Sequence, residues 1–130
     1  MVGWGVAGAV GAKLAFPNRP VVLLSGDGAM GFGLAELETA SRHGISFVAV
    51  VADDRAWGIV QSSQKRAFGR SAAVELGEVD FVKVAEGLGV KGLRAESFEE
   101  VVRAVGQGIR SEEPVLVHVP IEPGGPADLV

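Results

Sequence analysis

The chain contains no cysteine among its 130 residues. This absence excludes disulfides, zinc–thiolate sites and cysteine nucleophiles, and it fits a reducing cytoplasm, where we expect the protein to reside. Basic residues are also few: twelve Lys and Arg stand against sixteen Asp and Glu, which gives a net charge of −4. An acidic balance of this kind argues against a nucleic-acid partner.

Long hydrophobic runs are absent as well. No stretch reaches the roughly 18–20 uninterrupted apolar residues that a membrane helix needs, so we expect no membrane partner. The apolar segment 1–16 lacks the basic leading region of a secretory signal and contains Lys13, so it predicts a buried helix instead. With 48% hydrophobic residues, the chain has enough apolar side chains for one domain over 1–130, but it is too short for two.

Short apolar runs alternate with helical patterns along the chain. Two of the runs, 21–24 and 47–52, are continuously apolar, which is typical of strands buried on both faces. Strands separated by helices of about ten residues indicate an α/β fold with three layers and a mainly parallel sheet. We predict strands at 21–24, 47–52, 90–93 and 115–119, and helices at 3–15, 33–43, 58–66, 80–88 and 97–110.

Two of the predicted strands end in acidic residues. Asp27 follows the first strand, and Asp53 and Asp54 follow the second. Ligands of parallel sheets bind at the carboxyl ends of the strands, where the spacing is about 5 Å for neighbours or about 10 Å with one strand between them. Either spacing lets Asp27 and Asp54 converge on one hard cation.

The residues around Asp27 suit an anion. Gly28 lets the backbone approach a ligand closely, and the amides of residues 29–33 belong to the start of a predicted helix. Mg²⁺ commonly takes one or two carboxylates and bridges them to phosphate oxygens. The sequence therefore predicts a magnesium-dependent diphosphate site.

This pattern resembles the signature of thiamine diphosphate (ThDP)-dependent enzymes, in which Gly-Asp-Gly is followed about two dozen residues later by a polar pair at a strand end. The resemblance implies that Asp27, Asp54 and the backbone carbonyl of Ala56 bind Mg²⁺, and that Ala29 and Met30 meet the diphosphate. The full set of residues implied to bind the cofactor is Gly26, Asp27, Gly28, Ala29, Met30, Asp54, Ala56, Trp57, Gly58 and Ile59.

Nearly the whole chain is similar to the acetolactate synthase group, including Pro17-Asn18-Arg19-Pro20 and Ala56-Trp57-Gly58-Ile59. The resemblance implies the diphosphate-binding part of a 2-oxo acid decarboxylase or carboligase, with thiamine diphosphate and Mg²⁺ as cofactors. In this family the activating Glu lies on a separate pyrimidine-binding domain, usually of a partner subunit. We therefore expect no catalytic residue in this chain, and turnover only with a partner that carries that domain. We also expect the chain to associate, either with such a partner chain or as a homo-oligomer.

The sequence also departs from the family pattern. Asn is usual at the position of Asp54 and frequent at that of Asp53, so this site is more negative and should favour a divalent ion. Ser63 stands where acetolactate synthases commonly have a Trp at the substrate entrance, which leaves the substrate open. The family's first strand would precede residue 1, so we expect the domain to be N-terminally truncated.

Other interpretations stay open. Asp27 and Asp54 could simply cap the helices that follow their strands. Gly3-x-Gly5-x-x-Gly8, with Asp27 about twenty residues later, matches a dinucleotide-binding fingerprint, although that motif should follow a strand. The chain could also be a non-catalytic binding or assembly module, or a relic of a longer enzyme.

Three aromatic or imidazole side chains also remain ambiguous at this level. Trp57 could line the reaction pocket or anchor the turn that precedes it. His43 and His118 have no recognisable partner in the sequence.

Overall fold

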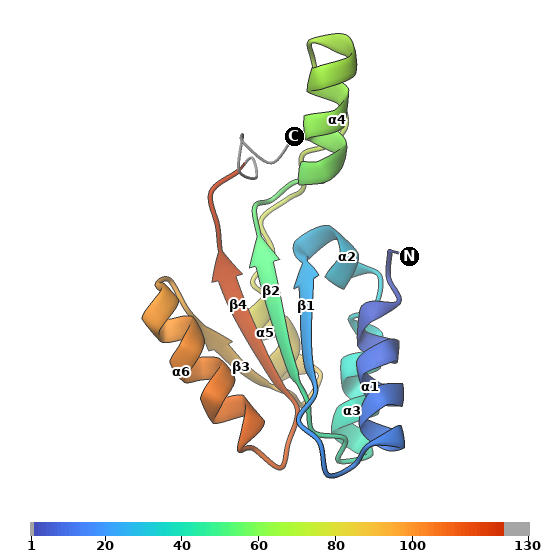
Figure 1. Cartoon of the computed structure of the whole chain (residues 1–130), viewed down its shortest axis with the longest axis vertical. Helices are drawn as coiled ribbons and strands as arrows, with labels where there is room; N and C mark the ends of the chain where they lie inside the picture. The colour runs from blue at the N-terminus through green and yellow to red at the C-terminus, as the bar shows by residue number, and fades with distance from the viewer. Residues whose placement is uncertain (1, 124–130) are drawn as a thin grey trace.

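Four parallel strands lie at the centre of the molecule in the order β1-β2-β4-β3 (Figure 1). The computed structural model describes residues 2–123. Its strands are β1 (Val22–Gly26), β2 (Val48–Asp53), β3 (Lys91–Arg94) and β4 (Val115–Pro120). Its helices are α1 (Gly5–Ala15), α2 (Asp27–Gly31), α3 (Ala35–Arg42), α4 (Gly58–Phe68), α5 (Phe81–Gly87) and α6 (Phe98–Ile109).

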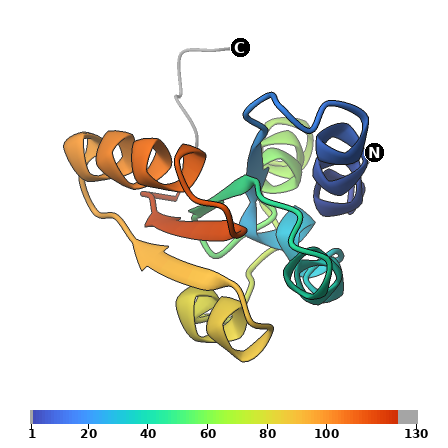
Figure 2. The ribbon, with the colours of Figure 1, turned by 90° about the horizontal axis from the view of Figure 1, so that it is seen from below.

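Helices cover both faces of this sheet (Figure 2). On one face α1, α3 and α5 enclose the larger core, in which Leu37, Phe81 and Leu116 are buried. On the other face α6 packs on β2 and β4 through a smaller, Val-rich core. The predicted α/β fold with three layers and a parallel sheet is confirmed.

Local sequence signals set the helix boundaries. Ser97 precedes α6, and its side chain accepts a hydrogen bond of 3.2 Å from the Glu100 amide. Asp80 precedes α5 and accepts one of 3.1 Å from the Lys83 amide. Gly89, just beyond α5, has a φ of +76°, a conformation that glycine adopts without strain. These caps agree with the predicted helices at 80–88 and 97–110.

The prediction that residues 21–24 are buried on both faces was wrong. Along β1 the side chains alternate between exposed and half-buried, and Leu24 is 74% exposed. The physical reason is position: β1 is the edge strand of the described sheet, and α6 does not extend over it. The central strand β2, predicted in the same way, is almost entirely buried.

Two helices also differ from the expectation. The helix predicted at 33–43 begins at Ala35, and a separate short helix, α2, follows β1 directly. Helix α4 matches the predicted 58–66 but extends away from the sheet, and none of its side chains is buried (Figure 1). Among the described residues, every helix is too short to span a membrane.

Two glycines of α6 provide a test of this packing. A Cβ at Gly108 would lie 2.6 Å from Val48 Cγ2, whereas a Cβ at Gly106 would meet only the tip of Arg110 at 3.6 Å. Gly108→Ala should lower the free energy of unfolding by about 1–3 kcal/mol because the buried contact is overpacked. Gly106→Ala should raise it by up to about 1 kcal/mol through helix propensity. Urea unfolding of both variants measures the difference, and equal effects would contradict this packing of α6 on β2.

Candidate functional site

The carboxyl ends of β1 and β2 bring the predicted acidic residues to one edge of the sheet. The two strands are direct neighbours, and Gly26 pairs with Ala52 in their register. Asp27 follows Gly26 as the first residue of α2, and it is 7% exposed. One oxygen of Asp27, Oδ1, accepts a hydrogen bond of 2.7 Å from the amide of Gly28. The carboxylates that follow β1 and β2 therefore lie at the same end of the sheet.

The turn that follows β2 is fixed by its own carboxylates. Asp53 Oδ1 accepts a hydrogen bond of 3.0 Å from the Arg55 amide, and Asp54 Oδ1 accepts one of 3.2 Å from the Ala56 amide. Arg55 has a φ of +55°, which is strained for a residue with a Cβ. The side chains of Asp53 and Asp54 thus both bind amides of the turn that follows them.

Residues 74–76 form main-chain hydrogen bonds with this turn. The Leu76 amide donates to the Arg55 carbonyl at 2.7 Å, and the Trp57 amide donates to the Val74 carbonyl at 2.8 Å. Between these bonds, Ala56 and Glu75 form an isolated antiparallel bridge. Main-chain hydrogen bonds therefore hold residues 55–57 on one side, while Asp53 and Asp54 hold them on the other.

Two glycines make room for functional side chains. A Cβ at Gly58 would lie 2.6 Å from Asp54 Oδ2, and a Cβ at Gly28 would lie 2.8 Å from the indole ring of Trp57. The Asp54 carboxylate thus lies over the first residue of α4, and the Trp57 ring lies directly on the Gly28 backbone. Close approach of this kind is a role that only glycine fills.

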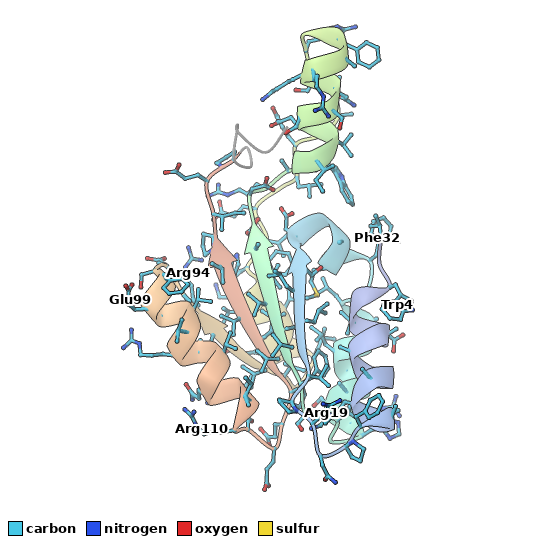
Figure 3. The ribbon with its side chains drawn as sticks, in the orientation of Figure 1. Trp4, Arg19, Phe32, Arg94, Glu99 and Arg110 are labelled. Carbon is cyan, nitrogen blue, oxygen red and sulfur yellow. The ribbon has the colours of Figure 1, made fainter. Side chains whose placement is uncertain are left out.

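Trp57 both anchors the turn and lines a cavity. Its ring centroid is 6.0 Å from that of Phe32, which projects from the end of α2 (Figure 3). The cavity of about 350 Å³ is mostly apolar and lies beside Asp27. Besides Asp27, Gly28, Phe32 and Trp57, its lining comprises Gly31, Leu34, Leu76, Gly77, Val79 and Phe81. No sequence pattern predicted that residues between 76 and 81 line a cavity.

The remaining residues predicted to bind the cofactor differ in how accessible their side chains are to a ligand. Met30 is 1% exposed with its side chain in the core, so only its main chain could meet a ligand. Ala29 is half-buried beside it in α2. Ile59, the second residue of α4, is 87% exposed.

His118 has a partner that the sequence did not reveal. Its Nε2 lies 2.8 Å from Oδ2 of Asp53, and both side chains are buried. The sequence could not reveal this partner because the two residues are 65 positions apart and meet only through the pairing of β2 with β4. His43, by contrast, is exposed at the end of α3, where its ring contacts Arg42.

The glycines near the N-terminus serve packing. A Cβ at Gly5 would lie 2.9 Å from Leu23 Cδ1, and one at Gly8 would lie 2.5 Å from the ring of Trp4. Gly5 therefore lets α1 approach β1 closely, and Gly8 makes room for the Trp4 ring at the start of the same helix.

The carboxyl cluster is electrostatically unbalanced. Burial raises the pKa of Asp27, and so do a hydrogen bond with Asp53 and the charges of Asp53 and Asp54, against the lowering effect of the Gly28 amide. Burial also acts to raise the pKa of Asp53, but hydrogen bonds from His118, the Arg55 amide and Asp27 outweigh it, and the pKa lies below its ordinary value. The site therefore keeps Asp53 ionised and disfavours ionised Asp27 unless a cation is near.

This imbalance predicts a pH-dependent gain of stability in Asp27→Asn. Because the pKa of Asp27 is raised in the folded state, the metal-free protein loses stability as the pH rises from the ordinary pKa of Asp to the raised one, and the loss is complete above the raised pKa. An amide oxygen can still accept from Gly28, so the variant should unfold at higher urea concentration at pH 7 in EDTA. The gain should vanish well below pH 3.8, the ordinary pKa of Asp, where the wild-type carboxyl is neutral in both states.

The control is Glu112→Gln, which changes an exposed carboxylate in the loop before β4. It should leave stability unchanged at both pH values. Equal or lower stability of Asp27→Asn at pH 7 would contradict the electrostatic account.

Comparisons with known proteins identify the family of this chain. Residues 1–119 match the family described as thiamine pyrophosphate enzyme, C-terminal TPP binding domain. Acetolactate synthase from Bacillus subtilis (strain 168) is 40% identical over 114 residues, which are 88% of this chain and 20% of that protein. Human 2-hydroxyacyl-CoA lyase 2 is 37% identical over 91% of this chain and 20% of its own length.

A solved structure gives the same result. The thiamine diphosphate-dependent 4-hydroxybenzoylformate decarboxylase of Rhodococcus jostii RHA1 superposes with a TM-score of 0.88 and 30% identity, over 93% of this chain and 23% of its own. The chain thus spans about a fifth of the length of the curated relatives that it matches. It belongs to the thiamine pyrophosphate enzyme family, as a C-terminal TPP binding domain.

Proposed function

We propose that this chain binds the diphosphate of ThDP through a Mg²⁺ ion held by Asp27, Asp54 and the carbonyl of Ala56. The observation that carries the proposal is the arrival of Asp27 and Asp54 at one edge of the sheet, at the ends of adjacent strands. Membership in a TPP-binding family supports the choice of cofactor.

The residues present fit a magnesium ion that is shared with a ligand. Among residues 2–123, no group of three or more His, Cys, Asp or Glu side chains is arranged to hold a metal alone. Mg²⁺ does not need such a cage, because it usually takes one or two carboxylates and completes its shell with phosphate oxygens and water. Two carboxylates and a carbonyl leave room for both.

The main chain that follows Asp27 can also serve an anion. Gly28 and Gly58 have no Cβ that would collide with Trp57 or Asp54, so these two side chains lie directly against the backbone beside the carboxylates. The amides of Ala29 and Met30, in the first turn of α2, would then donate to the diphosphate.

The excess negative charge explains why metal should be required. Asp27, Asp53 and Asp54 together repel a diphosphate, and they do so least when a divalent cation compensates them. Binding of ThDP without metal is therefore expected to be very weak. Asp53 would act indirectly, since its oxygens are engaged by Arg55 and His118.

We infer further that the chain acts as part of an acetolactate synthase-like 2-oxo acid decarboxylase or carboligase. When bound, the cofactor supplies the electron sink for cleavage next to a carbonyl. This chain would contribute position and electrostatics, and the proton-transfer groups would come from a pyrimidine-binding domain in a partner chain or another subunit. Leu24 is exposed on β1, the edge strand of the described sheet, so it belongs to an apolar surface that a further domain could cover.

Calorimetric titration of ThDP into the purified chain tests the site. Binding should require Mg²⁺ and disappear in EDTA. Asp54→Ala should weaken binding by more than about 100-fold, since changes one shell further from a metal already cost 10–100-fold. Asp54→Asn keeps one oxygen ligand and should bind measurably.

Glu112→Ala, which removes an exposed carboxylate from the other end of the strands, is the matched control and should bind like wild type. Metal-independent binding, or equal binding by Asp54→Ala, would reject the magnesium site. Turnover of a 2-oxo acid by the chain alone would reject the need for a second domain.

A further inference from the structure

The hydrogen bond between His118 and Asp53 joins two strands beside the candidate metal site. His118 lies on β4 and Asp53 at the end of the neighbouring strand β2, with 2.8 Å between Nε2 and Oδ2. His118 is 3% exposed and Asp53 is 7% exposed, so water does not compete for this bond. A charge-assisted hydrogen bond in such surroundings is strong and directional.

The chemistry of the two groups fixes the direction of the bond. The Asp53 carboxylate already accepts a hydrogen bond from a main-chain amide, and its second oxygen lies 2.8 Å from the imidazole nitrogen, so Nε2–H of His118 donates to Oδ2. The other oxygen accepts from the Arg55 amide at 3.0 Å, and the main-chain carbonyl of Asp53 accepts from the Ile121 amide at 2.9 Å.

Asp53 therefore links β4 to the turn that contains Asp54 and Ala56. This turn needs such support because Arg55 has a φ of +55° without being glycine. A residue in that conformation costs free energy and persists only when its surroundings determine it. If the Asp53 carboxylate rotated, the Arg55 amide would lose its acceptor and the turn would be free to relax.

We propose that His118 is a positioning residue, which fixes the Asp53 carboxylate and through it the Asp54–Ala56 turn for metal-dependent ThDP binding. This proposal rests on the proposed function for the role of the turn, but the hold on the turn itself does not depend on any ligand.

A packing role alone does not explain this side chain. The ring of His118 makes an edge contact with Phe81, with centroids 5.3 Å apart. Its second nitrogen, Nδ1, is buried without a hydrogen-bond partner. An unpartnered buried polar atom costs free energy, and an apolar side chain would fill the same space without that cost. The hydrogen bond from Nε2 to Asp53 is therefore what distinguishes His118 from an apolar side chain at this position.

Two amide substitutions separate the hydrogen bond from the packing. The side-chain nitrogen of Gln is as many bonds from Cβ as Nε2 of His, whereas that of Asn is one bond closer to the backbone. Both variants lose the imidazole contact with Phe81, and only His118→Gln can reach Asp53. We expect His118→Gln to bind ThDP in Mg²⁺ nearly as wild type does, and His118→Asn to bind about 10- to 100-fold more weakly.

Hydrogen–deuterium exchange of the ligand-free chain gives the second measurement. Amides of residues 53–57 should exchange faster in His118→Asn than in His118→Gln or wild type. The protection of α6, which packs on the opposite face of the sheet from Phe81, should stay the same in all three. Equal affinity and equal exchange of the two variants, with both folded, would overturn the proposal.

Failure of the proposed function would look different. If the wild-type chain showed no Mg²⁺-dependent ThDP binding, the magnesium site would be rejected. Faster exchange confined to residues 53–57 in His118→Asn would still support the hold of His118 on the turn, and unchanged exchange would overturn it.

Discussion

The pairing of β1 with β2 is the constraint on which the rest of the site depends. These strands are parallel and adjacent, so Gly26 stands beside Ala52 and the next residues of both strands emerge at one edge. Two buried carboxylates and a third beside them accumulate there. The strong hydrogen bonding around them follows, because charges brought together in a poorly solvated place need partners. Arg55, Gly28 and His118 supply those partners in the protein itself.

The amino-acid sequence was sufficient to predict the position of Asp27 and Asp54, because this position does not depend on the order of the strands. Asp27 and Asp54 each follow a strand of a parallel sheet, so they reach the same edge whichever strands are neighbours. It was insufficient where order matters. His118 meets Asp53 only because β4 inserts beside β2, and Leu24 is exposed only because β1 lies at the edge. An apolar run predicts a strand but not its place in the sheet.

The two sides of the candidate site have different characters. Toward the sheet, Asp53 and Asp54 accept hydrogen bonds from the amides of Arg55 and Ala56, and residues 74–76 form main-chain hydrogen bonds with the same turn. Toward the cavity, the lining is apolar and is formed by Trp57 and Phe32 with residues from the segment before α5. Such an arrangement places charge with high accuracy on one side and excludes water on the other, which suits recognition of a molecule with an ionic end and an apolar body.

The exposure of α4 has a consequence for how the molecule opens. This helix has eleven residues and no buried side chain, so tertiary contacts contribute little to its stability. Isolated helices shorter than about 12–15 residues are marginal in water. Helix α4 is thus the segment that should fray first, ahead of the cooperative unfolding of the sheet. A partner that binds α4 would also have to stabilise the helical conformation of this segment, and this cost lowers the affinity for the partner. In return, α4 would be fully helical only when the partner is bound.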